Sequence, residues 1–317
     1  MKDDQRQITL LGPQPNFATL KTALGRLNLQ SPVALITAGW ETDEQEDADV
    51  KQAASSIGVD CINLKLFART EQLFADDPEL IQTLQARQDE LRHLRNAYNE
   101  RLHHLLKAAR QTIRRHETLI ALTAERESAI DMVRQLDRQY FVRTSQIIDD
   151  YEARLQTANR PLVVEHRREI FEILGRVGAI LISGGHVAII LNRLKIFGIL
   201  ESSSDLPIIA WSGGTMALAD QIVFFHDAPP QGKGNPEVLR AGMGLFHDLL
   251  PLPDASTRLN LNDEARVELF ARRFENFRCV VFDDQTILER NQGNWSSMGI
   301  RPVTQLGDTG NVVGMNA

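Results

Sequence analysis

The residue best suited to nucleophilic chemistry in this sequence is Ser212, in the segment AWSGGTMAL. The apolar run before it predicts a strand, and the residues from Thr215 onward predict the start of a helix. A serine with small neighbours at a strand-to-helix turn is typical of a nucleophile elbow, in which a strained turn presents the hydroxyl. The amides that begin the helix could then stabilise an oxyanion. The same turn could instead redirect the chain or cradle a phosphate.

A serine nucleophile needs a general base, and two histidines are the main candidates for that role. His186 ends another predicted strand, so its imidazole could face Ser212 across two adjacent strands. It could also bind a ligand or cap the next helix. His247, in GLFHDLL, is the alternative, and His226 is a third option for which a structural role is favoured.

The cysteines and the remaining histidines predict neither a metal site nor a cofactor. Cys61 and Cys279 are far apart and lack a CxxC spacing, so we expect buried thiols rather than a disulfide or a zinc site. Neither cysteine stands at the elbow, which disfavours glutaminase chemistry through a thiolate. Four further histidines lie on a polar background, where solvated side chains are commoner than metal ligands: His93, His103, His104 and His116.

The elements that must position Ser212 follow from an alternation of apolar runs and amphipathic segments. Helices are expected between the apolar runs, as at 17–27, 188–197 and 262–274. Strands that are apolar throughout and separated by helices predict a mostly parallel sheet with helices on both faces. In such sheets the chemistry lies in loops at the carboxyl ends of the strands. The predicted strands are 8–12, 32–39, 61–67, 178–185, 207–214 and 279–284.

One long segment interrupts this alternation. No glycine occurs between Gly58 and Gly175, and the only prolines there are Pro78 and Pro161. The absence of both residue types from 79–160 predicts long helices. Apolar residues recur at steps of three, four or seven in two stretches separated by a weak break.

This segment predicts an inserted antiparallel helical hairpin. Asp77 supplies an N-cap and Pro78 the first helical position. The hairpin would occupy 73–160, between a first part of the α/β domain at 1–72 and its remainder at 161–317. Its apolar stripes could pack on the same domain or on a second subunit, and we expect a homodimer.

Charge and hydropathy exclude several classes of partner. The net charge is -7 and the pI about 5.7, so nucleic acid is not an expected partner. No apolar run approaches the length of a membrane span, and the N-terminus lacks the pattern of a secretory signal. We therefore expect a cytoplasmic protein that does not bind membranes.

Taken together, the motifs resemble the cyanophycinase and aspartyl dipeptidase family of serine peptidases, whose fold is class I glutamine-amidotransferase-like, or flavodoxin-like. AWSGGTMAL resembles the family's G-[TW]-S-A-G-A elbow. ILISGGHVAIILNRLKIFGIL is similar to its strand, GG[NQ] turn and helix, and LITAGWETDE and CVVFDDQTIL resemble two further segments. The resemblance covers most of 1–72 and 161–317 and leaves the hairpin outside.

The resemblance implies roles for individual residues of the predicted site. Ser212 would be the nucleophile and the Gly213 amide one oxyanion donor. Gly184 and Gly185 would offer the second donor, and Trp211 would stand beside the serine in the substrate site.

The resemblance also leaves one role unfilled. The family's general base is a histidine in a [DN]-x-H-F segment, and the corresponding stretch here reads LPLPDAST, with Asp254 near the expected place. His186 takes the position of the family's Asn or Gln, and Asp227 falls where the dipeptidase branch has an acidic residue, which would orient the base. The sequence thus predicts a serine hydrolase of a small peptide or amide substrate, with the base open between His186 and His247. The alternative is an inactive relative that binds a ligand, or a protein through its hairpin.

Overall fold

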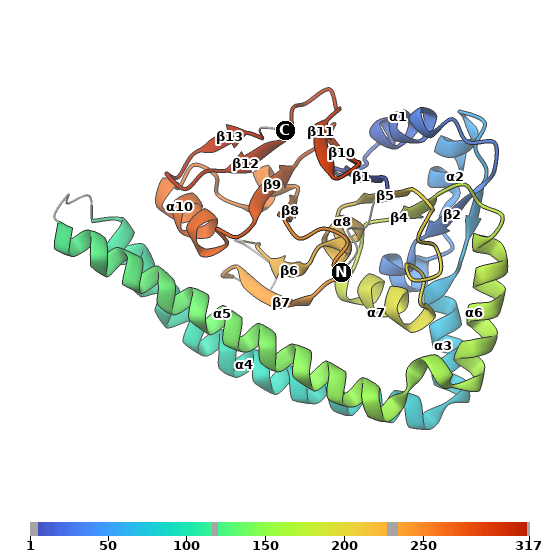
Figure 1. The fold of residues 1–317 in the computed structure, drawn as a ribbon, viewed down its shortest axis with the longest axis horizontal. Helices are drawn as coiled ribbons and strands as arrows, with labels where there is room; N and C mark the ends of the chain where they lie inside the picture. Colours follow the sequence, from blue (N-terminus) through green and yellow to red (C-terminus); the bar gives the residue numbers. More distant parts are fainter. Residues whose placement is uncertain (1–5, 116–119, 227–233, 316–317) are drawn as a thin grey trace.

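The computed structural model describes residues 6–115, 120–226 and 234–315, and its centre is a seven-stranded sheet (Figure 1). The strand order is β11-β10-β1-β5-β4-β2-β3. Five of these strands are mutually parallel: β1, β5, β4, β2 and β3. Strand β10 pairs antiparallel with β1, and β11 pairs antiparallel with β10. The strands are β1 (Ile8–Leu11), β2 (Val33–Ile36), β3 (Cys61–Asn63), β4 (Ile180–Ile182), β5 (Ile208–Trp211), β10 (Ile287–Asn291) and β11 (Asn294–Ser297).

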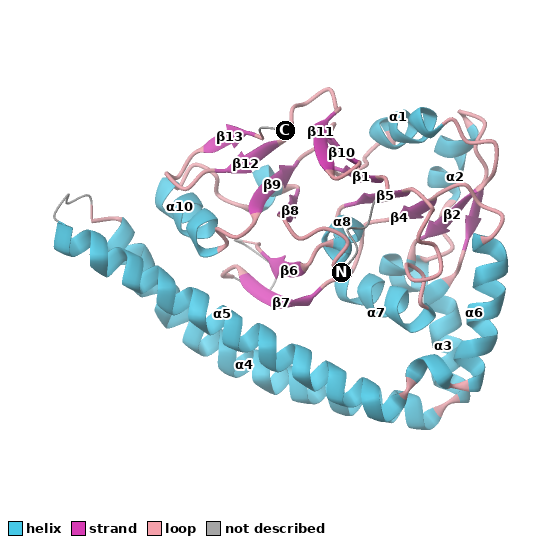
Figure 2. Cartoon of the chain, viewed as in Figure 1, coloured by secondary structure: helices cyan, strands magenta, loops and turns pink. Residues whose placement is uncertain are grey.

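Helices cover both faces of this sheet, as predicted (Figure 2). Successive strand residues point to opposite faces, so Leu35 packs in one core while Ile36 packs in the other. The first core holds α1 (Ala18–Leu27) and α2 (Ala48–Ser55). The second holds α3 (Leu66–Asp76), α6 (Pro161–Leu174) and α7 (Val187–Phe197). The short η1 (Ala38–Asp43) follows β2, and η2 (Thr157–Asn159) precedes α6.

A second group of strands follows β5. The sequence pattern did not distinguish these strands from those of the central sheet. The predicted strand at 279–284 forms as β9, but it belongs to a four-stranded sheet of order β13-β12-β9-β8, and this is a correction to the prediction of a single sheet. A ribbon of β6 and β7 lies beside it. The elements are α8 (Gly213–Leu218), β6 (Gln221–Phe224), β7 (Glu237–Ala241), β8 (Leu249–Pro253), α9 (Ala255–Arg258), α10 (Glu264–Arg273), β9 (Arg278–Phe282), β12 (Thr304–Leu306) and β13 (Val312–Gly314).

The inserted helical hairpin is confirmed. It consists of α4 (Pro78–Ile113) and α5 (Ile120–Leu155), which run antiparallel along one side of the molecule (Figure 1). The Asp77 carboxylate accepts a hydrogen bond of 3.0 Å from the Leu80 amide, as expected of an N-cap. The predicted boundary between 72 and 73 falls inside α3, which continues to Asp76.

The hairpin packs on its own domain through a buried polar cluster. The Tyr98 hydroxyl donates to Asp137 Oδ1 at 2.8 Å, which joins α4 to α5. Arg273 of α10 donates to both oxygens of Asp137, at 2.6 and 2.7 Å. Arg273 also donates to the Pro236 carbonyl, and the Val238 amide donates to the Tyr98 hydroxyl. The cluster therefore ties both hairpin helices to α10 and β7.

Within the described residues, the long helices are too polar to cross a membrane. The described hairpin residues include buried apolar side chains and many exposed charged ones.

Candidate active site

Ser212 lies at a strained turn at the carboxyl end of β5, a strand near the middle of the sheet. Its φ is 50° and its ψ is -120°, a conformation that L-residues rarely adopt. The residue is the N-cap of α8, which begins at Gly213. Because β4 pairs with β5 in parallel, the loop that follows β4 ends beside this turn. The predicted geometry of an elbow on top of a parallel sheet is thus present.

Glycines allow three loops to approach one another at this turn. A Cβ on Gly184 would stand 2.8 Å from the Ser212 Cβ, and one on Gly213 would overlap the Gly185 carbonyl oxygen. Gly185 has a φ of 112°, and a Cβ there would overlap the carbonyl of Gly39 in η1, which follows β2. The site is therefore built from backbone packed against backbone, which only glycine permits at these positions.

Two backbone amides near the serine have no hydrogen-bond partner in the described part of the chain. The His186 amide donates to the Gly39 carbonyl oxygen at 2.8 Å and fixes the turn after β4. By contrast, the amides of Gly185 and Gly213 make no hydrogen bond to any other described residue. Unpaired amides on either side of a serine are suited to stabilise a negative oxygen.

A cavity of about 250 Å³ opens at the elbow. Its polar lining consists of Ser212, His186, His226 and Arg258. The apolar part comes from α7, α8, β6 and the end of β8 and holds Val187, Met216, Phe224, Phe225 and Pro253. The size and the few convergent polar groups suit a small ligand or the end of a larger one.

The three histidines considered as general base occupy different places. His186 is exposed at the start of α7 and lines the cavity of Ser212. His226 also lines it, and its Nε2 lies 2.7 Å from an Arg258 guanidinium nitrogen. His247 lies outside the lining, where its Nδ1 is 3.1 Å from Asp220 Oδ1 and its side chain is half exposed. The structure thus brings His186 and His226 to the serine's cavity, and His247 does not reach it.

The other predicted site residues are distributed around the elbow. The Trp211 side chain is buried in the core beneath α1 and α2 and is not part of the cavity lining. Asp254 precedes α9 and accepts hydrogen bonds from the Thr257 hydroxyl and, at 3.4 Å, from Arg258. Asp227 lies outside the described residues.

Arg258 is the cavity residue that sequence reasoning missed. Its position depends on α9, a single turn that follows β8 in the second sheet. The available signal was the spacing of Asp254 and Arg258, four residues apart, which favours an ion pair on one helical turn. That spacing gives no indication that Arg258 would meet His226.

Neither cysteine is among the residues that line this cavity. Burial raises the pKa of Cys61 to about 11 and raises that of Cys279 further, so both thiols stay protonated at neutral pH. Among the described residues no three His, Cys, Asp or Glu side chains are grouped to hold a metal ion.

Comparison with solved structures identifies the class of fold. No family model matches the chain, and no curated protein matches its sequence. A peptidase from an acI-B1 actinobacterium is similar over 98% of this chain and 97% of its own, with a TM-score of 0.51 and 12% identity. A candidate peptidase E of Listeria monocytogenes EGD-e covers 93% of this chain and 99% of its own, with a TM-score of 0.47 and 11% identity. The similarity to the first of these structures supports a flavodoxin-type α/β fold, here with a long helical insertion.

Proposed function

We propose that the protein is a serine hydrolase that cleaves a peptide or amide bond in a small substrate, related to the cyanophycinase and aspartyl dipeptidase family. The observation that carries the proposal is the strained conformation of Ser212 between two unpaired amides. Such strain costs about 1–3 kcal/mol, and it is typically retained where the turn serves a function. The peptidase-like fold supports the same reaction class.

The proposed reaction uses the backbone around the elbow. The Ser212 Oγ attacks the substrate's carbonyl carbon, and its proton passes to an imidazole nitrogen. The amides of Gly185 and Gly213 donate to the oxyanion of the tetrahedral intermediate. Collapse of the intermediate breaks the C–N bond, and the imidazolium returns the proton to the leaving amine. Water then releases the acyl group by the same steps.

His186 is the proposed general base, and His226 is the alternative. The Arg258 guanidinium can only donate, so the Nε2 of His226 is engaged as an acceptor. A positive neighbour also disfavours the imidazolium that a general base must become. No described cation is bonded to the His186 ring, which lines the same cavity as Ser212.

A fluorophosphonate probe tests this function. We expect Ser212 to displace fluoride from phosphorus and the intact mass to rise by that of the probe less HF. The Ser212→Ala variant should gain no mass, while Ser256→Ala, which removes a hydroxyl bonded to Asp283, should label like the parent. An unlabelled parent protein, or a labelled Ser212→Ala variant, would contradict the proposal.

The same assay assigns the base. His186→Ala should label much more slowly than the parent, because the serine loses its proton acceptor. His247→Ala serves as the matched control, since His247 lies outside the cavity and pairs with Asp220. If His226→Ala slows labelling and His186→Ala does not, the base is His226.

A second candidate function is a non-catalytic binding module. It is favoured by one observation: the Ser212 hydroxyl makes no hydrogen bond to any other described residue. A serine without a bonded base is a weak nucleophile. In that case the cavity would bind a ligand without cleaving it, and the probe would leave the parent unlabelled.

We further propose that the protein is a homodimer that pairs through the outer side of its hairpin. Met132 and Val142 of α5 are 54% and 62% exposed, although other apolar residues of this helix, such as Val133, are buried. Light scattering should give twice the 35.6 kDa mass of the chain. Replacing both residues by serine should favour the monomer, and a monomeric parent would refute the dimer.

A further inference from the structure

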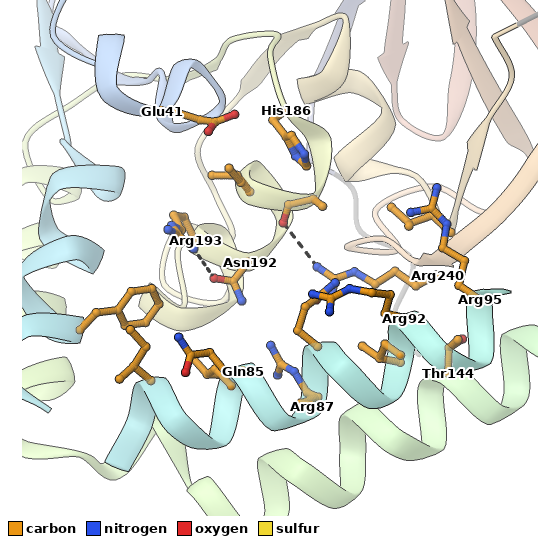
Figure 3. Close-up of a pocket in the computed structure, with 18 of the residues that line it drawn as sticks. Glu41, Gln85, Arg87, Arg92, Arg95, Thr144, His186, Asn192, Arg193 and Arg240 are labelled. Carbon is orange, nitrogen blue, oxygen red and sulfur yellow. Dashed lines mark hydrogen bonds between the residues drawn. The ribbon is translucent and has the colours of Figure 1, made fainter. Parts of the chain in front are cut away.

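A second and larger cavity lies between the hairpin and α7 (Figure 3). Its volume is about 530 Å³. Five arginines from α4, α7 and β7 line it, and Glu41 is the one carboxylate among the described lining residues. The lining is therefore rich in basic side chains, although the net charge of the protein is -7. The arginines are Arg87, Arg92, Arg95, Arg193 and Arg240.

Three of these arginines already have partners. Arg95 forms an ion pair with Glu237. Arg193 lies 3.6 Å from Glu71 and donates to Asn192 at 2.7 Å. Arg92 pairs with Asp89 on the surface of the hairpin. Their charges are at least partly balanced within the chain.

Arg87 and Arg240 form no ion pair with any described residue, although the negative charge of Glu152 acts on Arg87. Arg87 is only 9% exposed, and it makes no hydrogen bond or ion pair with any described residue. Arg240 makes one long hydrogen bond, of 3.4 Å, to the Ala188 carbonyl, and its Nε is buried without a partner. Figure 3 shows both side chains extending into the same part of the cavity.

The proximity of two cations that have no ion-pair partner among the described residues is costly in the absence of a bound anion. Burial and then the charge of Arg87 lower the pKa of Arg240 to about 10. Burial also lowers the pKa of Arg87, and the negative charge of Glu152 offsets part of that shift. A guanidinium is protonated at neutral pH even so, and a buried, unpaired charge opposes folding unless a counter-charge is supplied.

We propose that this cavity binds a small molecule that carries at least two negative charges, as phosphate or carboxylate groups, between Arg87 and Arg240. Guanidinium groups bind both kinds of oxyanion in a bidentate manner. The volume exceeds that of an inorganic ion and lies within the range of about 300–1,000 Å³ typical of small-molecule sites. The site exists because the insertion supplies Arg87, so it is a property of the hairpin rather than of the elbow.

The two cavities meet at His186, which lines both. A bound anion would therefore lie close to the proposed general base. The anion site nevertheless does not depend on a reactive serine, because its ligands come from α4 and β7. A binding measurement on the full chain separates the two proposals.

Calorimetric titration and thermal unfolding with pyrophosphate and, separately, citrate test the proposal in a low-salt buffer free of other polyanions. We expect at least one of these anions to bind and to raise the unfolding midpoint, since ligands that bind only the native state stabilise it. Tighter binding of pyrophosphate would indicate a phosphate ligand, and tighter binding of citrate a carboxylate ligand.

Variants show whether the binding occurs in this cavity. Arg87→Met should lose roughly tenfold or more in affinity, because a charge-assisted hydrogen bond is removed. It should also unfold no lower than the parent without anion, because an unpaired buried charge is gone. Arg240→Met should act alike, whereas Arg101→Gln, at an exposed position on the same helix, should bind as the parent does. Absence of binding by both anions, or equal affinity in the parent and both methionine variants, would overturn the proposal.

Discussion

Replacing Asp137 by alanine is expected to reduce the free energy of unfolding by about 3–5 kcal/mol, which denaturation in urea would measure. Asp137 is the only carboxylate that contacts the Arg273 guanidinium among the described residues, and both side chains are buried. Its loss would leave a buried cation without a counter-charge. The Tyr98 hydroxyl, which donates to the same carboxylate, would also lose its acceptor.

Asp131→Ala is the matched control for this prediction. Asp131 lies on the same helix and pairs with Arg134, but its carboxylate is largely exposed. Exposed ion pairs contribute about 0–1 kcal/mol. Equal losses in the two variants would show that the buried cluster does not hold the hairpin on the domain.

A double replacement separates the charge from the packing. Asp137→Leu combined with Arg273→Met removes both charges and keeps apolar volume. Because a buried ion pair offsets its own desolvation only in part, the double variant should recover most of the stability that either single change loses. If the double variant does not recover this stability, the hydrogen bonds of Arg273 to Pro236 and Tyr98 contribute more to the free energy of unfolding than its ion pair with Asp137.

The extent to which the sequence predicted the fold depends on how local each signal is. The hairpin was predictable because the absence of glycine and proline and a helical period both act within one segment. The strands β1, β2, β4 and β5 were predictable because they are apolar apart from Thr9. The second sheet was not predictable, because strands such as β12 and β13 are short and half exposed. They show neither a continuous apolar run nor an alternation of apolar and polar residues.

The candidate site shows the same division. Ser212 and Gly185 were placed together because adjacent parallel strands end at one edge of a sheet. The pairing of His226 with Arg258 was not predictable, since it depends on how the β6–β7 ribbon meets the second sheet. The pairing of Asp137 with Arg273 and the meeting of Arg87 with Arg240 depend in turn on where the hairpin docks. A contact between side chains more than a hundred residues apart leaves no periodicity in the sequence.

Replacing Gly185 by alanine is expected to disrupt the elbow more than replacing any other glycine of the elbow by alanine. At a φ of 112° an L-residue is strained, and the new Cβ would overlap the Gly39 carbonyl oxygen. The turn would have to move, and the free energy of unfolding should fall by more than about 2 kcal/mol. The displaced Gly185 amide should also slow the reaction of Ser212 with a fluorophosphonate by about 10²-fold, the effect expected from the loss of one oxyanion donor.

Gly58→Ala provides the control that makes this result interpretable. Gly58 also has a positive φ, of 79°, but a Cβ there meets no atom within 4 Å, and the residue is remote from the elbow in the fold. This variant should lose only about 1–2 kcal/mol from backbone strain and should label at the parent's rate. Two variants with the same loss of stability and unchanged labelling would mean that the turn after β4 tolerates movement. In that case the Gly185 amide would have no part in the chemistry, and the oxyanion would depend on Gly213 alone.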